Sequence, residues 1–450
     1  MSDTETVPKR RESRRPSQLV PKLRLLYTPE SGLLSGSRLH SLSLGETTIG
    51  RDPGGTTGLS VQGDRGMSRT HARLVVEDES LAVSICDQHS KNGTFVNRER
   101  ITTTTRLSDG DIIQTGDSFW LLRYEHRSLK DEVIASIVGV SAPMKACRVQ
   151  VARYAKASCP LLILGATGTG KEVVAKAIHL LSKRTGPLKP VNCAAIPETL
   201  AESEFFGHVA HSFTGAKNSI GHYLAADRGT LFLDEIGDMK SSLQPLLLRA
   251  LEEGRITPIG TTNSVAADVR IVAATNRGLT ADVDAGRFRP DLLARLSGIE
   301  IHLPRLRDRR EDILLLLHHF LAGRTAELSC ELIEALLTHD WPFNVRELSK
   351  AAERLVLDGP ESLISEYENS LQGKAPMTTT HEAVGRKLAP RSRRTDPSSA
   401  EIIAALTECD GVVIQAAGRL RIPRPRLYQL MDKLGIDKDL FRPSHRELPQ

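Results

Sequence analysis

The sequence predicts a multidomain protein with three fold classes: an all-β sandwich, an α/β domain with a helical subdomain, and a small all-α module. Three patterns support this prediction. Short β-forming runs separated by turn residues occupy residues 21–125, apolar strands alternate with helix-period segments at residues 134–371, and short helical runs occupy residues 400–441. At roughly 100–200 residues per domain, 450 residues are enough for such an arrangement.

The composition excludes several protein classes. With 40% hydrophobic residues and a net charge of +5 from 60 basic and 55 acidic side chains, the chain is neither wholly disordered nor collagen-like, and any nucleic-acid surface must be local. The cysteines have no CxxC pair and no cluster at metal spacing, which favours a reducing compartment. No apolar run approaches the roughly 20 residues of a membrane span, and residues 1–17 are polar. We therefore expect no membrane span, no signal peptide and a cytoplasmic location.

The first domain is predicted from its β-forming runs. These runs lie at residues 23–27, 47–49, 72–76, 81–85 and 118–122, and their spacing is typical of a sandwich. Ahead of them, the basic residues 1–20 predict a disordered arm, for which a solvated tail is favoured over a nucleic-acid contact. Residues 372–399, with several prolines and arginines, predict a flexible linker.

A glycine-rich loop follows the strand expected at residues 161–164 and precedes a helical run at residues 172–181, which is the context that a P-loop requires. Its backbone N–H groups and the helix N-terminus favour phosphate, and Lys171 is expected to pair with the β and γ phosphates of ATP. Glu172 stands where a Ser or Thr usually meets Mg²⁺. The residues expected to bind the nucleotide here are Gly165, Ala166, Thr167, Gly168, Thr169, Gly170, Lys171 and Glu172.

A second apolar strand, expected at residues 230–233, ends in two carboxylates. Asp234 is expected to hold Mg²⁺ directly or through water, and Glu235 to activate the attacking water as general base. A glycine turn and a solvated acidic strand end would explain each motif alone. The two motifs in this order favour a Mg-ATP site.

Residues 134–364 resemble the AAA+ domain of bacterial enhancer-binding proteins, the ATP-driven activators of sigma-54 RNA polymerase. Besides the P-loop and the acidic strand end, the matching segments are residues 191–194, 202–208, 213–216, 272–276, 288–296 and 341–348. The resemblance implies that Asn192 gates the catalytic glutamate and that Asn276 and Arg346 sense the nucleotide. As single polar residues at strand ends, Asn192 and Asn276 could instead be ordinary turn formers.

The same resemblance implies that Arg289 and Arg295 act in trans on a neighbour's nucleotide, so that hydrolysis requires a hexameric ring. Guanidinium groups suit this role because they stay charged and present planar forked donors. The alternative is a surface ion pair, which is the default expectation for arginines in a charged segment such as residues 305–312.

A loop that contacts sigma-54 in the family is matched by Phe213, Thr214, Gly215 and Ala216. His211 and Ser212 depart from the family's Gly and Ala. Related activators without this loop work without sigma-54, so this alternative stays open.

The β sandwich resembles a forkhead-associated (FHA) domain, which binds phosphothreonine peptides. The resemblance rests on residues 50–51, 68–71, 87–97 and 107–111. It implies that Arg51, Ser68 and Asn92 bind the phosphopeptide with added charge from Arg69 and Lys91. His71 is expected to be a buried, hydrogen-bonded strut. An Asn-Gly hairpin beside an exposed arginine is the alternative.

The C-terminal region resembles the Fis-type helix-turn-helix of the same activators. Residues 411–431 carry four arginines and no acidic residue, which indicates a local DNA surface. Arg424, Arg426, Tyr428 and Gln429 are expected to contact DNA. The expected packing residues are Ala416, Ala417, Leu420, Ile422, Leu427 and Leu430. Arg421 in the turn and Pro423 and Pro425 at the helix start depart from the family, and a plain helical packing module is the alternative.

Taken together, the expected protein activates sigma-54 RNA polymerase with Mg²⁺ and ATP, binds upstream promoter DNA, and responds to a phosphothreonine protein. The alternative is a phosphopeptide-binding DNA regulator that acts without sigma-54 and uses its ATPase for assembly.

Overall fold

The computed structural model divides the chain into two compact units, residues 1–377 and residues 378–450. It describes residues 19–371 except 31, 55–56, 78–80, 127–130, 211–217 and 325–327, with only the backbone at 32–37 and 368–371. In the second unit it describes residues 397–408, 419–420, 427, 430–431, 434 and 436. No helix in these described parts is both long and apolar enough to cross a membrane.

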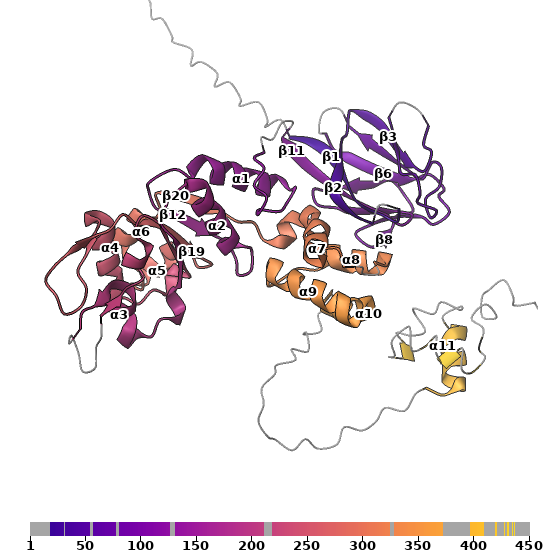
Figure 1. Cartoon of the computed structure of the whole chain (residues 1–450). Coiled ribbons are helices and arrows are strands. Elements are labelled where there is room, and N and C mark those ends of the chain that lie inside the picture. Colours follow the sequence, from indigo (N-terminus) through magenta and orange to yellow (C-terminus); the bar gives the residue numbers. More distant parts are fainter. Residues whose placement is uncertain are drawn as a thin grey trace, which may run out of the picture. The chain divides into compact units, whose positions relative to one another are not determined.

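The N-terminal domain is a sandwich of two sheets, as predicted (Figure 1). The six-stranded sheet has the order β2-β1-β11-β10-β7-β8, and the five-stranded sheet has the order β4-β3-β5-β6-β9. The strands are β1 (Leu19–Thr28), β2 (Gly32–Ser41), β3 (Gly45–Gly50), β4 (Gly58–Ser60), β5 (Ala72–Val76), β6 (Val83–Asp87), β7 (Thr94–Val96), β8 (Glu99–Arg100), β9 (Thr105–Leu107), β10 (Ile112–Thr115) and β11 (Ser118–His126).

The central domain is built on a parallel sheet of order β13-β16-β19-β12-β20. Its strands are β12 (Leu161–Leu164), β13 (Leu188–Asn192), β16 (Thr230–Asp234), β19 (Arg270–Thr275) and β20 (Ile299–His302). The helices and short 3-10 turns around it are α1 (Ala142–Tyr154), α2 (Lys171–Ser182), η1 (Cys193–Ala195), η2 (Glu198–Leu200), α3 (Ala201–Phe206), η3 (Leu224–Ala226), η4 (Ile236–Asp238), α4 (Leu243–Glu253), α5 (Leu279–Asp284) and α6 (Pro290–Leu296). Two short hairpins, β14 (Gly207–His208) with β15 (Ser219–Ile220) and β17 (Arg255–Ile256) with β18 (Val265–Ala266), complete it.

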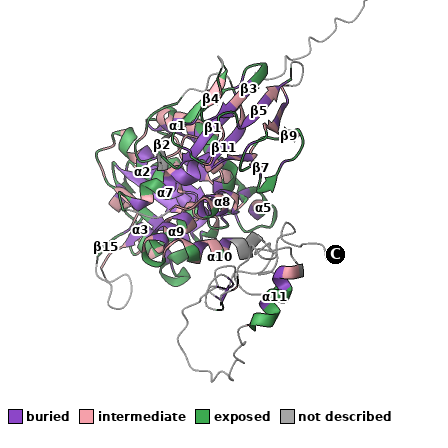
Figure 2. Ribbon diagram, turned by 90° about the vertical axis from the view of Figure 1, so that its right-hand side faces the viewer, coloured by how far each residue is buried: buried purple, intermediate pink, exposed green. Residues whose placement is uncertain are grey.

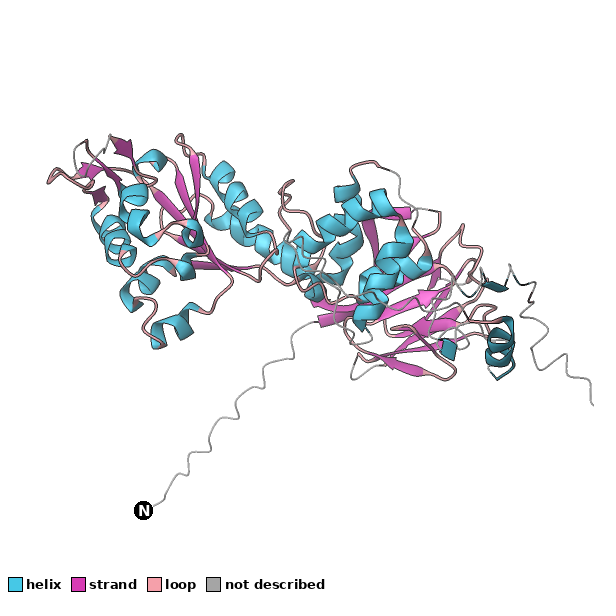
Figure 3. Cartoon of the chain, turned by 90° about the horizontal axis from the view of Figure 1, so that it is seen from below, coloured by secondary structure: helices cyan, strands magenta, loops and turns pink. Residues whose placement is uncertain are grey.

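Both faces of this sheet are covered, as Figure 3 shows for the helices around the strands. Alternate residues of β16 enter different cores: Leu231 and Leu233 belong to one apolar cluster, and Phe232 to another. Strands buried on both faces read as continuous apolar runs, which is why the sequence predicted them well.

A helical subdomain follows the sheet. It consists of η5 (Leu306–Asp312), α7 (Ile313–Leu321), α8 (Cys330–Thr338), α9 (Asn344–Asp358) and α10 (Pro360–Leu371). Trp341 is buried at its centre and donates its indole N–H to the carbonyl oxygen of Leu336 over 3.0 Å. In Figure 2 much of the α7 ribbon carries the colour of buried residues.

In the second unit, α11 (Ser399–Glu408) buries Ile402, Ala405 and Leu406. These side chains cluster with Leu427, Leu430 and Met431, and Leu420 packs against the cluster. Three of the expected packing residues, Leu420, Leu427 and Leu430, therefore contribute to a core, whereas Ala416, Ala417 and Ile422 lie outside the described residues.

Candidate functional site

The glycine-rich loop lies between β12 and α2, where the sequence predicted it. Gly168 and Gly170 have φ angles of 78° and 106°, in the left-handed region that favours glycine. A methyl group at Gly168 would also overlap the carbonyl oxygen of Phe343. Because α2 begins at Lys171, the loop presents a helix N-terminus with free N–H groups to an anion.

Lys171 and Glu235 come together at this loop. The Lys171 side chain is only 7% exposed; its ammonium donates to the Gly165 carbonyl oxygen over 3.1 Å and lies 3.5 Å from a Glu235 carboxylate oxygen. Glu235 follows the last residue of β16 and has a left-handed backbone, with φ 49° and ψ 51°. A non-glycine residue in this conformation costs about 1–2 kcal/mol, and such residues are concentrated at functional sites.

Asn276 joins the two motifs. Its backbone N–H donates to the Glu235 carboxylate over 3.4 Å, and its side-chain amide donates to the Thr167 hydroxyl of the glycine loop over 2.8 Å. This sensor candidate therefore lies between the phosphate-binding loop and the expected base, rather than serving only its own turn.

The oxygen donors at the end of β16 suit Mg²⁺. Asp234 accepts the Glu235 N–H over 3.0 Å and keeps its carboxylate at the strand end. Mg²⁺ typically takes one or two carboxylates together with substrate phosphate oxygens, which fits this donor set. Glu172 does not join it: its exposed carboxylate pairs with Lys176 over 2.7 Å along α2.

Asn192 pairs in register with Asp234 on the neighbouring strand. Its side-chain oxygen accepts the Ala194 N–H over 2.9 Å and caps η1. This hydrogen bond fits the turn-forming interpretation of Asn192. Its partner in the register, Asp234, directly precedes Glu235, and the expected gating of Glu235 by Asn192 stays a prediction.

The helical subdomain also contacts the glycine loop, through residues that sequence reasoning missed. Arg309 donates to the Thr169 carbonyl oxygen over 3.1 Å, and Asn344 donates to the Thr167 carbonyl oxygen over 2.9 Å. Arg346, the expected second sensor, donates its backbone N–H to the Gly168 carbonyl oxygen over 3.3 Å.

The expectation that arginines of residues 305–312 serve surface ion pairs is wrong for Arg309, which is 2% exposed. The charge-rich sequence gave no signal for this burial.

Arg289 and Arg295 lie at the two ends of α6 and are exposed. The Arg289 guanidinium forks onto Asp291, with contacts of 2.6 and 3.1 Å, and these hydrogen bonds lower the pKa of the Asp291 carboxyl. A phosphate of the nucleotide bound to a neighbouring subunit would have to compete with Asp291 for the Arg289 guanidinium.

The base of the expected sigma-54 loop is the β14–β15 hairpin. The Ala210 N–H donates to the Asn218 side-chain oxygen over 2.6 Å and holds the two strands together. His211, Ser212, Phe213, Thr214, Gly215 and Ala216 lie outside the described residues.

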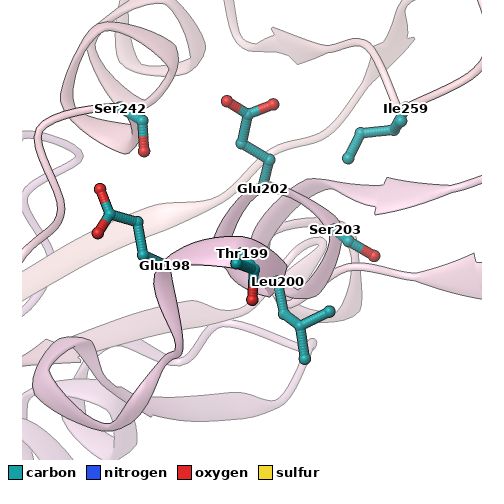
Figure 4. A pocket seen from close by; sticks show the side chains of 7 residues that line it. All are labelled: Glu198, Thr199, Leu200, Glu202, Ser203, Ser242 and Ile259. Atoms are coloured by element: carbon teal, nitrogen blue, oxygen red, sulfur yellow. The ribbon is translucent and has the colours of Figure 1, made fainter.

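A pocket of about 480 Å³ lies next to this hairpin, since its lining residue Ile259 forms a β-bridge with His208 of β14. Figure 4 shows the residues that line this pocket. Glu198 and Glu202 also line it, together with Leu200 and Ser242. It shares no residue with the P-loop, and its two carboxylates would repel a phosphate. It is therefore not the nucleotide site.

At the sandwich, the three predicted loops are joined by hydrogen bonds. The Arg51 N–H donates to the Ser68 carbonyl oxygen over 2.9 Å, the Ser68 hydroxyl accepts the Lys91 N–H over 3.1 Å, and the Asn92 amide donates to the Gly66 carbonyl oxygen over 2.8 Å. The side chains of Arg51 and Asn92, like those of Arg69 and Lys91, belong to exposed residues. The loops therefore present several cationic and amide donors on one rigid support.

The prediction that His71 is a buried strut is confirmed. One ring nitrogen accepts the Ser68 N–H over 3.1 Å, and the other donates to the Gly93 carbonyl oxygen over 3.1 Å. Burial lowers the pKa of His71, which keeps the ring neutral, as this pair of bonds requires.

The four residues expected to contact DNA, Arg424, Arg426, Tyr428 and Gln429, lie outside the described residues.

Family comparisons agree with this architecture. A sigma-54 interaction domain model matches residues 137–302, an FHA domain model matches residues 47–116, and an AAA+ ATPase lid domain model matches residues 307–382. The α/β domain is therefore an AAA+ ATPase domain, and the helical subdomain is its lid.

Relatives that match part of this chain are named as transcriptional regulators. The chain is 40% identical over 338 residues to the DNA-binding transcriptional activator HyfR of Escherichia coli K12, covering 70% of this chain but only 50% of HyfR. It is 42% identical over 302 residues to the transcriptional regulatory protein ZraR of Salmonella typhimurium, covering 65% of this chain and 67% of ZraR. It is 39% identical over 337 residues to the DNA-binding transcriptional regulator NtrC of Rhizobium meliloti, covering 67% and 70%. The chain belongs to the family of sigma-54-dependent transcriptional regulators.

Proposed function

We propose that this chain hydrolyses Mg-ATP to activate sigma-54 RNA polymerase, from upstream DNA and under the control of a phosphothreonine protein. The observation that carries the proposal is the joint position of Lys171, Glu235 and Asn276, which brings a phosphate-binding loop, a carboxylate base and a sensor amide within hydrogen-bonding reach of one another. Hydrolysis of a nucleoside triphosphate needs these three groups together.

In the proposed reaction, the loop N–H groups and Lys171 bind the β and γ phosphates, so that a phosphate displaces Glu235 as the partner of the ammonium. Glu235 then takes a proton from the attacking water. Asp234 would hold Mg²⁺, which would supply charge stabilisation to the phosphates. Asn276 holds the Glu235 carboxylate through its backbone N–H and reports the state of the loop through Thr167.

Arg289 and Arg295 complete the site of a neighbouring subunit in a hexameric ring. Their exposure on α6 supports this role, because each guanidinium is accessible to another molecule. An arginine supplied in trans stabilises the charge that spreads over the transferred phosphoryl group.

The loop between β14 and β15 transmits the free energy of ATP hydrolysis to sigma-54, with Phe213 and Thr214 as the contact pair. Upstream promoter DNA is held by Arg424, Arg426, Tyr428 and Gln429. Phosphothreonine is bound by Arg51, Ser68 and Asn92, with Arg69 and Lys91 adding charge, and the exposed donors of the joined loops support this role.

The test is open-complex formation by reconstituted sigma-54 polymerase on a promoter with an upstream binding site. Full-length protein with ATP should open the promoter, and Glu235→Gln should bind ATP without opening it. ATP turnover without any effect on sigma-54 polymerase would refute the proposal and would favour a regulator that uses its ATPase only for assembly.

A further inference from the structure

The FHA domain and the lid share an apolar core. Along β11, Trp120 and Leu122 pack in the sandwich core, whereas Phe119 and Leu121 point the other way and join the cluster of the lid. Phe119 and Leu121 are at most 1% exposed. The FHA domain therefore packs on the lid with the outer face of its six-stranded sheet, and Arg51, Arg69, Lys91 and Asn92 of the expected phosphothreonine site remain exposed.

Arg123 adds an ion pair to this contact, with the buried Glu311 and a partly buried guanidinium. Two nitrogens of its guanidinium donate to one Glu311 carboxylate oxygen over 2.9 and 3.2 Å, and one of them also donates to the Asp308 carbonyl oxygen over 3.1 Å. Its third nitrogen donates to Asp109 within the FHA domain over 3.1 Å. Burial raises the pKa of the Glu311 carboxyl, and the charge and hydrogen bonds of Arg123 oppose this shift.

Glu311 belongs to η5, and η5 holds the P-loop. Within its seven residues, Arg309 donates to the Thr169 carbonyl oxygen of the P-loop over 3.1 Å. Arg309 has a non-helical backbone, with φ −135° and ψ 53°, which interrupts the helical turns of η5. At the end of η5, Asp312 accepts two backbone N–H groups and the Ser141 hydroxyl at the start of α1.

From this arrangement we propose that Arg123 of the FHA domain is a positioning residue for ATP hydrolysis. By fixing Glu311 and Asp308, it fixes η5, and η5 in turn fixes the P-loop through Arg309. The FHA domain is then a working part of the ATPase and not only a receptor tethered to it.

The first test compares full-length Arg123→Ala with the unchanged protein in ATP affinity, KM and kcat. The variant leaves Glu311 buried without its partner, so we expect roughly fivefold or greater weakening of ATP binding and a matching rise in KM, with kcat per folded molecule changed less. The matched control is Arg73→Ala, which removes an exposed FHA ion pair to Glu46 on the other sheet and should leave all three quantities unchanged.

A merely structural role predicts a different pattern: a smaller folded fraction, hence a lower apparent kcat at constant KM. Unchanged ATP affinity and KM in Arg123→Ala would overturn the proposal. If Arg123→Ala does not fold, Arg123→Lys replaces it, because an ammonium keeps the charge but cannot reach all three acceptors. An unchanged KM in a folded Arg123→Lys, with peptide exchange at η5 also unchanged, would overturn the proposal equally.

A double-mutant cycle with Glu311→Gln locates the effect. A neutral amide costs less to bury unpaired than a carboxylate, so adding Glu311→Gln to Arg123→Ala should recover part of the lost ATP affinity. Additive losses would mean that the two residues act separately, which would also refute the proposal.

The interface between the FHA domain and the lid also extends toward the phosphothreonine loops. The inference drawn from this extension rests on the proposed function. Buried Asp64 accepts the Gly66 N–H over 2.9 Å and the Asp117 N–H over 3.0 Å, while Asp117 lies 3.7 Å from the Cys330 sulfur at the start of α8. We therefore expect ATP and a phosphothreonine peptide to change each other's affinity by the same factor. A peptide that binds without this reciprocity refutes the coupling, whereas a peptide that does not bind refutes phosphothreonine recognition and leaves the Arg123 result intact.

Discussion

Asn344 offers a direct test of how the lid is attached to the P-loop. It is 2% exposed and has a φ of 53°, and its side chain bridges two backbone groups. It accepts the Leu306 N–H over 2.8 Å and donates to the Thr167 carbonyl oxygen over 2.9 Å. The substitution Asn344→Ala removes both bonds and puts alanine in a left-handed conformation.

The size of the effect follows from these contacts. Leu306 is fully buried, so an unpaired N–H there costs about 1–3 kcal/mol. Thr167 is half-buried and water can bond its carbonyl oxygen, so that loss is nearer to about 1 kcal/mol. The left-handed backbone adds about 1–2 kcal/mol for alanine. We therefore expect Asn344→Ala to lower the free energy of opening the lid by about 3–6 kcal/mol in total.

The assay is native-state hydrogen exchange of η5 and the first turn of α9, supported by melting followed through the fluorescence of Trp341, with Trp120 replaced by Phe. Asn344→Gly should be less destabilised than Asn344→Ala by roughly 1 kcal/mol, because glycine adopts the left-handed region freely. Exposed Asn263→Ala is the matched control and should change stability by less than about 0.5 kcal/mol. If Asn344→Ala also changes stability by less than about 0.5 kcal/mol, the two hydrogen bonds of the Asn344 side chain do not stabilise the closed lid, and the reasoning is refuted.

The remaining predictions concern hydrolysis and the input signal. Glu235→Gln should keep ATP affinity within about threefold and lower turnover by roughly 100-fold or more, measured by nucleotide titration and phosphate release; appreciable turnover would exclude Glu235 as the base. Arg295→Ala should be inactive alone but regain activity when mixed with Lys171→Ala, which supplies an intact arginine to its neighbour's site; no recovery at any mixing ratio would contradict action in trans. Arg51→Ala should weaken a phosphothreonine peptide by more than about tenfold in calorimetric titration, since charge-assisted hydrogen bonds contribute about 1.5–3 kcal/mol each. Equal affinity for phosphorylated and unphosphorylated peptides would remove this domain's assigned role.

The local signals of the sequence were sufficient to predict the glycine-rich loop and the acidic strand end. The strand predicted at residues 161–164 is β12 residue for residue, and Asp234 is the last residue of β16. Both strands are buried on both faces and therefore appear as unbroken apolar runs. The glycine loop needs positive φ angles at Gly168 and Gly170, so its composition and its conformation are tied together.

The contacts of η5 could not be predicted from local patterns of the sequence. Charged residues such as Arg309 and Glu311 are usually solvated, and only the packing of the lid between the P-loop and the FHA domain removes them from water. The ion pair of Glu172 is local by contrast: its carboxylate pairs with Lys176 one helical turn along α2, and its expected nucleotide contact stays a prediction.

The sequence by itself therefore determined the domain classes, the phosphate-binding loop, the acidic strand end and the sandwich loops, because each depends on residues close together in the chain. One signal was present but incomplete. The run Phe119 to Leu122 is apolar at every position, which indicates that both faces of β11 are covered, but the run does not say which part of the protein covers the second face. Only the tertiary structure decided that the lid covers the outer face, that Arg123 meets Glu311, and that Asn344 and Arg309 hold the P-loop. The hydrogen-bonded pairs among these contacts join residues 140–188 positions apart, and their pairing is set by shape and desolvation that no local pattern encodes.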